Sequence, residues 1–346
     1  MKPSNAQSTL PAFLITIDTE GDNIWASPRQ IETQNAKFLP RFQELCELYG
    51  LKPTYLTNYE MAVSDSYIEF ASDCLHRKTA EIGMHLHAWN SPPEKALTED
   101  DYRFLPYLIE YPKELVEQKI DYLTKLLEDT FNTKMTSHRA GRWAFDEHYA
   151  QTLAKHGYKV DCSVTPGVSW RKNMGDPKQQ GGTDYRDFPD HPYFLDLNNI
   201  GQAGNSNLLE LPVSILPKYS PFISRCRKAV NQLKGRQKDD ATIWLRPNGK
   251  NLKQMKKVLD EAIRKNRPYV EFILHSSEFM PGGSPTFKTN ESIEALYRDL
   301  TQLFEYTRRH FIGLTLTEFA EQFHRQVKQD DTDGELASFH PYNAQT

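Results

Sequence analysis

Short, mostly apolar runs alternate along the chain with longer stretches in which apolar residues recur every three or four positions. The short runs are typical of strands, and the longer spacing places apolar residues on one face of a helix. Strands are predicted at residues 12–18, 53–57, 80–85, 158–162, 269–275 and 312–315, with a further short strand ending at Ser137. Helices are predicted at residues 36–49, 65–77 and 146–156, and from apolar faces formed by Val116, Ile120, Leu123 and Leu127, by Leu252, Met255, Leu259 and Ala262, and by Ile293, Leu296, Leu300 and Leu303. Such alternation predicts an α/β fold around a parallel sheet, either a barrel or a doubly wound sheet.

Two stretches depart from this alternation. Residues 171–193 are rich in Gly, Pro, Asp and Gln, which predicts a long loop beside the functional cleft. The last residues are polar and acidic and show no periodicity, which is typical of a disordered tail. We therefore expect an N-terminal extension over residues 1–11, a single domain over 12–325 and a disordered tail over 326–346.

The composition is that of a soluble globular protein, with 38% hydrophobic and 25% charged residues and a formal net charge of −4. Because the chain carries no excess of positive charge, nucleic acid is not an expected partner. No apolar run approaches the roughly 18 residues that a transmembrane helix needs. The polar N-terminus is unlike a signal peptide. We expect a cytoplasmic protein without a transmembrane segment, and the sequence predicts no particular oligomeric state.

The four cysteines are Cys46, Cys74, Cys162 and Cys226. They lie far apart and form no C-x-x-C pair, so neither a disulfide framework nor a thiolate zinc site is expected. Buried free thiols are the simpler interpretation.

Three of the predicted strands end in side chains that can do acid–base or metal chemistry. The first ends in Asp18, with Glu20 and Asp22 after it; the third ends in His85, followed by His87; and the strand at 269–275 ends in His275. In α/β barrels the C-terminal ends of the strands carry the catalytic groups. A single histidine would most simply be a core or surface residue, but the three strand ends together indicate a metal-dependent hydrolase.

These strand ends resemble the ordered motifs of the polysaccharide deacetylases, the NodB-homology family of carbohydrate esterases. The resemblance runs from residue 12 to about residue 323, and its five motifs occur in the family's order. The second histidine of the second motif comes at His87 rather than four residues after His85. The matching segments are Thr16-Ile17-Asp18-Thr19-Glu20-Gly21-Asp22, Glu81-Ile82-Gly83-Met84-His85, Arg139-Ala140-Gly141-Arg142-Trp143, Asp161-Cys162-Ser163 and Leu274-His275.

The resemblance implies a distorted (β/α)7 barrel, similar to a TIM barrel. It also implies an N-deacetylase that uses a divalent metal, most simply zinc. The T-x-D-x-E opening, the H-L-H-x-W segment and the stretch from His275 to Pro285 are similar to a cytoplasmic branch found in O-antigen and other surface-polysaccharide gene clusters. The implied substrate is an amino sugar that is nucleotide-linked, lipid-linked or part of an oligosaccharide.

Residue spacing suggests how a metal could be held. If the chain is extended there, His85 and His87 project from the same face and could bind one ion together. The family's second aspartate is replaced by Thr19, so the carboxylate ligand would be Glu20, which shares a face with Asp18, or else Asp22. Asp22 could equally be a turn-forming residue after Gly21.

The remaining roles follow from the resemblance. It implies that Asp18 is the general base, that His275 is the general acid, that Asp161 supports His275 and that Arg139 orients the catalytic carboxylate. Alternatively, Asp18 itself binds the metal. Residues assigned to substrate binding are Trp89, Trp143, Arg142, Ser276 and Glu278, although either tryptophan could instead pack in the core.

Two other functions are compatible with the motifs. One is a metal-independent hydrolase of cyclic or small amides, which the substitution at Thr19 and the displaced His87 leave open. The other is a non-catalytic carbohydrate-binding protein, which would need neither Asp18 nor His275. The basic stretch 225–238, with Arg246 and Lys250, could contact an anionic carrier, but a solvated helix face is the commoner explanation of such a run.

Overall fold

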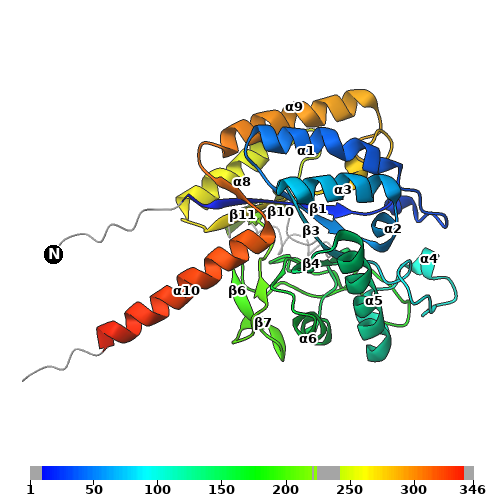
Figure 1. The fold of residues 1–346 in the computed structure, drawn as a ribbon, viewed down its shortest axis with the longest axis horizontal. Coiled ribbons are helices and arrows are strands. Elements are labelled where there is room, and N and C mark those ends of the chain that lie inside the picture. The colour runs from blue at the N-terminus through cyan, green and yellow to red at the C-terminus, as the bar shows by residue number, and fades with distance from the viewer. Residues whose placement is uncertain (1–9, 220–221, 224–241, 339–346) are drawn as a thin grey trace, which may run out of the picture.

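The computed structural model describes residues 10–219, 222–223 and 242–338. The strands are β1 (Ala12–Thr19), β2 (Pro53–Thr57), β3 (Glu81–Leu86), β4 (Ser137–Ala140), β5 (Val160–Asp161), β6 (Tyr193–Asp196), β7 (Asn199–Ala203), β8 (Leu209–Glu210), β9 (Ile215–Pro217), β10 (Thr242–Trp244), β11 (Tyr269–His275) and β12 (Ile312–Leu314). Ten of them form one sheet in the order β11-β1-β2-β3-β4-β5-β8-β6-β7, with β12 beside β1. The strands from β11 to β8 are parallel, and the sheet curls into a half-barrel (Figure 1).

The predicted α/β fold with a curled, barrel-like parallel sheet is therefore confirmed. Each predicted strand is present, although β4 begins at Ser137 rather than ending there and β5 is shorter than expected. The strands β6 to β10 were not predicted, because each has only two to five residues and so shows no clear periodicity.

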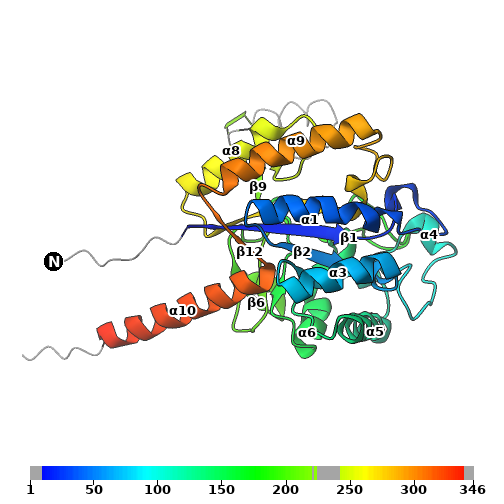
Figure 2. The same cartoon turned by 45° about the horizontal axis from the view of Figure 1, so that its top comes forward.

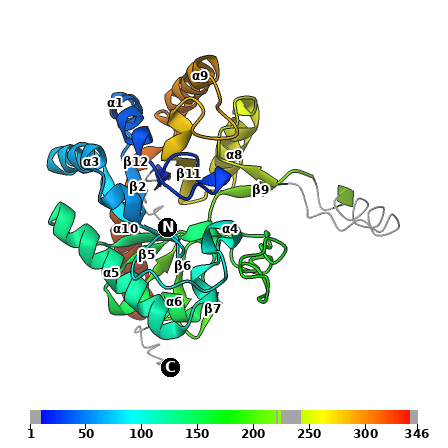
Figure 3. The same cartoon turned by 90° about the vertical axis from the view of Figure 1, so that its right-hand side faces the viewer.

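Most of the helices lie on the outer side of the sheet (Figure 2), and Figure 3 shows them arranged around it. The main helices are α1 (Leu39–Leu48), α3 (Asp65–Arg77), α5 (Lys113–Phe131), α6 (Glu147–Lys155), α8 (Leu252–Arg264), α9 (Asn290–Thr307) and α10 (Leu316–Ser338). Short helices are α2 (Tyr59–Ala62) and α4 (Asp101–Phe104), and single 3-10 turns are η1 (Ile24–Ala26), η2 (Gln34–Phe38), η3 (Leu108–Glu110), η4 (Gly141–Trp143) and η5 (Ser276–Phe279). The helix predicted at 36–49 is divided into η2 and α1, with Pro40 in the first turn of α1.

Alternation along β1 separates two buried regions. Phe13, Ile15 and Ile17 belong to the large core between the sheet and the helices. Leu14 belongs to a smaller cluster that also contains Leu316 and Phe319 of α10. Residues of a strand alternate between its two faces, so Thr16 and Asp18 share the inner face with Leu14. The first turns of α10 thus pack against the N-terminal half of the barrel interior, and the polar residues occupy the C-terminal half.

Two expectations for irregular segments, the loop at 171–193 and the C-terminal tail, can be compared with the structure. The long loop over 171–193 is present, with β6 beginning at Tyr193 and one isolated bridge between Ser169 and Asp184. Helix α10 runs to Ser338, so residues 326–338 differ from the expected disordered tail. These residues extend α10, whose first turns are anchored on the barrel. Extending a formed helix costs far less free energy than starting a new one. Within the described ranges, no helix combines the length and apolar character needed to cross a membrane.

Candidate active site and metal centre

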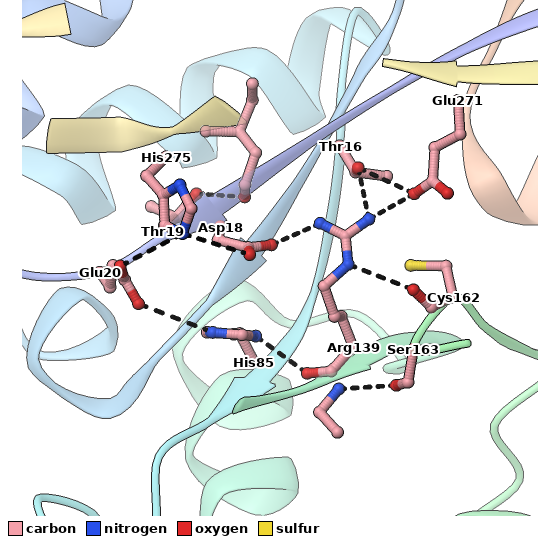
Figure 4. A network of polar contacts seen from close by, with 12 residues as sticks. Thr16, Asp18, Thr19, Glu20, His85, Arg139, Cys162, Ser163, Glu271 and His275 are labelled. Carbon is pink, nitrogen blue, oxygen red and sulfur yellow. Dashed lines mark hydrogen bonds and ion pairs between the residues drawn. The ribbon is translucent and has the colours of Figure 1, made fainter. Parts of the chain in front are cut away.

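The C-terminal ends of β1, β3 and β11 meet at one edge of the curled sheet (Figure 4). The parallel register of β1 and β11 sets Asp18 opposite His275, and that of β3 and β4 sets His85 opposite Arg139. The strands therefore bring together the side chains that the sequence placed at their ends.

Glu20, His85 and His87 form a compact buried group in which one ligand atom from each lies within 4.8 Å of the others. The two Nε2 atoms are 3.1 Å apart. Glu20 Oε2 lies 3.6 Å from Nε2 of His85 and 3.4 Å from Nε2 of His87. Two imidazoles and a carboxylate are a donor set that suits zinc and leaves room for further ligands.

Hydrogen bonding and burial prepare the two imidazoles for this role. His85 Nδ1 lies 2.9 Å from the carbonyl oxygen of Arg139 and donates to it, which leaves the lone pair of Nε2 facing Glu20. Burial, assisted by neighbouring His85, lowers the pKa of His87 to about 3, so this ring is neutral near pH 7. Gly141 allows close packing here, because an added Cβ would lie 2.4 Å from Cδ2 of His87. The residues present therefore fit a divalent metal.

Of the two carboxylates considered for the metal, Glu20 lies with the histidines and Asp22 does not. The Asp22 carboxylate accepts hydrogen bonds from the backbone N–H groups of Gln34 and Asn35, at 3.0 and 2.9 Å, and from the Asn35 side chain. It therefore anchors the loop after β1 to the segment around Asn35. The chain leaves the strand after Thr19, so strand spacing does not carry Asp22 into the site.

Asp18 and Arg139 form a buried ion pair beside the group of Glu20, His85 and His87 (Figure 4). Arg139 Nη1 donates to Asp18 Oδ1 at 2.5 Å. Burial alone would raise the pKa of Asp18, but the charges of Arg139, His85 and His275 outweigh burial and hold this pKa far below its usual value. Asp18 is thus a carboxylate at any pH at which the protein would work.

His275 lies between the two carboxylates, with Nε2 3.7 Å from Asp18 Oδ2 and 3.7 Å from Glu20 Oε1. Its Nδ1 is 3.2 Å from Glu278 Oε2, which also accepts from the backbone N–H of His275. Arg246 Nη2 donates to the same Glu278 oxygen at 2.9 Å. The indole of Trp25 meets the imidazole edge-on, with ring centroids 4.8 Å apart. His275 is therefore held by Glu278 just after its own strand, by Arg246 after β10 and by Trp25 in η1.

The expected support of His275 by Asp161 is wrong in its geometry. Asp161 Oδ1 lies 2.5 Å from Nδ1 of His138, and the carboxylate also accepts from the backbone and hydroxyl of Ser163. The register of β4 and β5 sets His138 directly opposite Asp161. The Asp161 carboxylate therefore binds the imidazole of His138 rather than that of His275. The carboxylate beside Nδ1 of His275 is that of Glu278 instead.

The residues assigned to substrate binding lie around this centre, but several have structural contacts. Ser276 Oγ donates to the backbone carbonyl of Glu20 and accepts from its N–H, so it fixes Glu20. Arg142 donates to the carbonyl oxygens of Leu105 and Met174, which ties two loops together. Trp89 is 9% exposed and stacks on His87 with centroids 4.4 Å apart. These three side chains are thus largely engaged within the protein.

Trp143 offers more surface than Trp89. It is half-buried, and the guanidinium of Arg139 lies 4.8 Å from the centre of its ring. Two further half-buried indoles, Trp170 and Trp244, lie 6.5 and 6.0 Å from it between centroids. An aromatic wall formed by Trp143, Trp170 and Trp244 therefore lies beside Arg139 and its partner Asp18.

Sequence reasoning missed Glu60 and the contacts of Arg246. Glu60 accepts from the N–H of Gly21 at 2.7 Å and from Asn90 Nδ2 at 2.9 Å, and burial, with nearby Glu20, raises its pKa to about 7. It lies in a one-turn helix and carries no periodic signal.

Of the basic residues considered for an anionic carrier, Arg246 contacts Glu278, Lys250 is exposed, and stretch 225–238 falls outside the described residues. Cys46, Cys74 and Cys162 are buried free thiols, and Cys226 also falls outside those residues.

No model of a known protein family matches the sequence, and no curated protein does. Solved structures share the fold. A candidate glycoside hydrolase/deacetylase from Parabacteroides distasonis matches with a TM-score of 0.59 at 11% identity, over 92% of this chain and 73% of that one. A candidate polysaccharide deacetylase from Mycobacterium smegmatis matches with a TM-score of 0.51 at 15% identity, over 91% and 92%. The allantoinase PuuE matches with a TM-score of 0.52 at 12% identity, over 94% and 92%. The chain thus has the deacetylase-type α/β barrel fold.

Proposed function

We propose that this protein is a metal-dependent hydrolase that removes an N-acyl group, most simply N-acetyl, from an amino sugar. The observation that carries the proposal is the convergence of Glu20, His85 and His87 with Asp18 and His275 at adjoining strand ends. A sugar-binding protein without catalysis would have no use for a carboxylate and an imidazole held beside such a donor set. The solved structures of similar fold, which include two candidate deacetylases, support the same reaction class.

Glu20, His85 and His87 would hold the ion. A divalent metal at such a site lowers the pKa of water and polarises an acyl oxygen, which is the help that hydrolysis of a stable amide needs. Zinc is the simplest candidate for an imidazole-rich set.

Asp18 is the proposed proton acceptor. It stays ionised through its pairing with Arg139, and its second oxygen faces His275 across 3.7 Å. A proton taken from water by Asp18 is therefore next to the imidazole that must later release one. His275, positioned by Glu278, is the proposed donor to the departing amine.

The substrate class follows from the aromatic wall of Trp143, Trp170 and Trp244. Indole rings stack well on the apolar faces of sugars. This wall contacts Arg139, which in turn pairs with Asp18, the proposed proton acceptor. A role in making a surface polysaccharide such as O-antigen, inside the cell, completes the proposal and rests on the sequence motifs.

The proposal is tested with protein that is stripped by a chelator and reloaded with zinc. Chitin oligosaccharides and UDP-N-acetylglucosamine serve as probes, and released acetate is measured. We expect acetate release from at least one probe with zinc and a return to background after stripping. Metal-loaded protein that releases no acetate from either would count against the proposal. Hydrolysis of a cyclic amide by the stripped protein would instead support a metal-independent amide hydrolase, and oligosaccharide binding without turnover a carbohydrate-binding protein.

A further inference from the structure

Arg139 is shared between two acidic side chains that come from different strands. Its guanidinium donates to Asp18 on β1 and, from the other nitrogen, to Glu271 on β11, and that nitrogen also donates to Thr16 Oγ1 at 2.6 Å (Figure 4). Nε donates to the carbonyl oxygen of Cys162 at 3.3 Å. Arg139, Glu271 and Thr16 are fully buried. One guanidinium charge therefore has to serve two carboxyl groups inside the barrel.

Glu271 is poorly supported as an anion. Its Oε1 accepts from Arg139 and Thr16, but its Oε2 is buried and has no hydrogen-bond partner among the residues that the structure describes. Burial raises its pKa to about 7, although Arg139 opposes the shift. The titratable and charged groups around Glu271 are Arg139 on β4, Asp18 on β1, Cys162 after β5, Glu210 on β8 and Tyr269 on β11 itself. Of these, Arg139 alone is cationic, so little else compensates ionised Glu271.

We propose that Glu271 is a positioning residue whose protonation state controls how strongly Arg139 binds Asp18, an inference that rests on the proposed function. When Glu271 is neutral, the guanidinium charge serves Asp18 almost alone. When Glu271 is ionised, it competes for Arg139, and Asp18 becomes the stronger proton acceptor. The effect reaches Asp18 through Arg139, because Glu271 itself contacts neither the candidate metal ligands nor His275.

Glu271→Gln tests this directly, because glutamine resembles the neutral acid, keeps an acceptor for Arg139 and Thr16, and does not titrate. The readout is the ratio of wild-type to E271Q kcat/KM across pH 5.5 to 8.5, in which titrations common to both proteins cancel. We expect the ratio to rise by roughly two- to tenfold as the pH passes about 7, because proton acceptance strengthens with basicity. A ratio that stays flat, even if E271Q is uniformly slower, would mean a purely structural role.

A second readout needs no turnover. A carboxyl whose pKa is raised in the folded state stabilises the fold below its unfolded pKa, and this contribution is lost as the pH rises through the folded pKa. Wild type should therefore lose stability relative to E271Q between about pH 5 and 7 and then level off. If metal-loaded wild type hydrolyses no probe, the proposed function fails, and this difference decides alone whether Glu271 titrates as inferred; a constant difference overturns the inference.

Glu210→Gln is the matched control. Glu210 is also a fully buried glutamate on the barrel wall, but it bonds to the N–H of Val164 and does not contact Arg139. Burial and neighbouring Asp161 raise its pKa well above the usual value, which favours its neutral form. E210Q should leave the kcat/KM ratio independent of pH. The control applies to this ratio alone, because a buried acid whose pKa is raised on folding itself makes the stability difference depend on pH.

Discussion

Replacing Asp18 with asparagine is expected to lower kcat/KM by about 10²- to 10⁴-fold, the range typical for removing a general base. Asparagine keeps the size of the side chain and can still accept from Arg139, but it cannot take a proton. Because Asp18 lies outside the group of Glu20, His85 and His87, bound metal should remain. Rates of acetate release and metal content, measured on the same preparation, check both statements.

Asp22→Asn is the companion variant. Asp22 is also an aspartate near the C-terminal end of β1, but its carboxylate binds the backbone of Gln34 and Asn35, and asparagine can keep one of these bonds. We expect little change in kcat/KM. A D18N protein that remains nearly as active as wild type would contradict the role of Asp18, and an inactive, metal-free D22N protein would return Asp22 to the list of ligands.

Replacing Arg139 with methionine is expected to lower the free energy of unfolding by about 3–5 kcal/mol, the usual cost of removing one partner from a buried ion pair. Its side chain is 0% exposed, and its removal leaves Asp18 and Glu271 as buried acids without their cation. Urea unfolding followed by circular dichroism measures the change. If the methionine variant does not fold, Arg139→Lys, which keeps the charge but not the forked geometry, should give an intermediate loss.

Arg77→Met provides the control for charge removal in general. Arg77 also pairs with two carboxylates, those of Glu47 and Asp73, but its side chain is 38% exposed. Exposed pairs contribute about 0–1 kcal/mol each, so this variant should be close to wild type. Equal losses at Arg77 and Arg139 would show that the buried network has no special weight.

Strand periodicity was enough to predict the main elements of the site. Asp18, His85 and His275 were placed correctly because each follows an apolar run, and parallel strands present their C-terminal ends at one edge. His85 and His87 share a face because residues two apart in an extended chain do so. These inferences need only local sequence.

What the sequence could not supply was contact between segments. Spacing left Glu20 and Asp22 open, and the turn after Thr19 decides between them. Asp161 was assigned to His275, whereas the register of β4 and β5 gives it His138. The contact of Arg246 with Glu278 could not be anticipated, because β10 is too short to show periodicity. Register and loop path depend on the packing of the whole barrel, which no single segment encodes.

Metal content tests the central claim most directly. Protein purified without added metal and then titrated with zinc is compared with the His85→Ala variant and with His76→Ala, which removes an exposed histidine on α3. We expect about one equivalent of tightly bound zinc in wild type and in H76A, and a large loss of affinity in H85A, since structural and catalytic zinc sites need at least three protein ligands. Wild type that binds no metal on titration, or H85A that binds it as tightly as wild type, would contradict a metal centre formed by Glu20, His85 and His87.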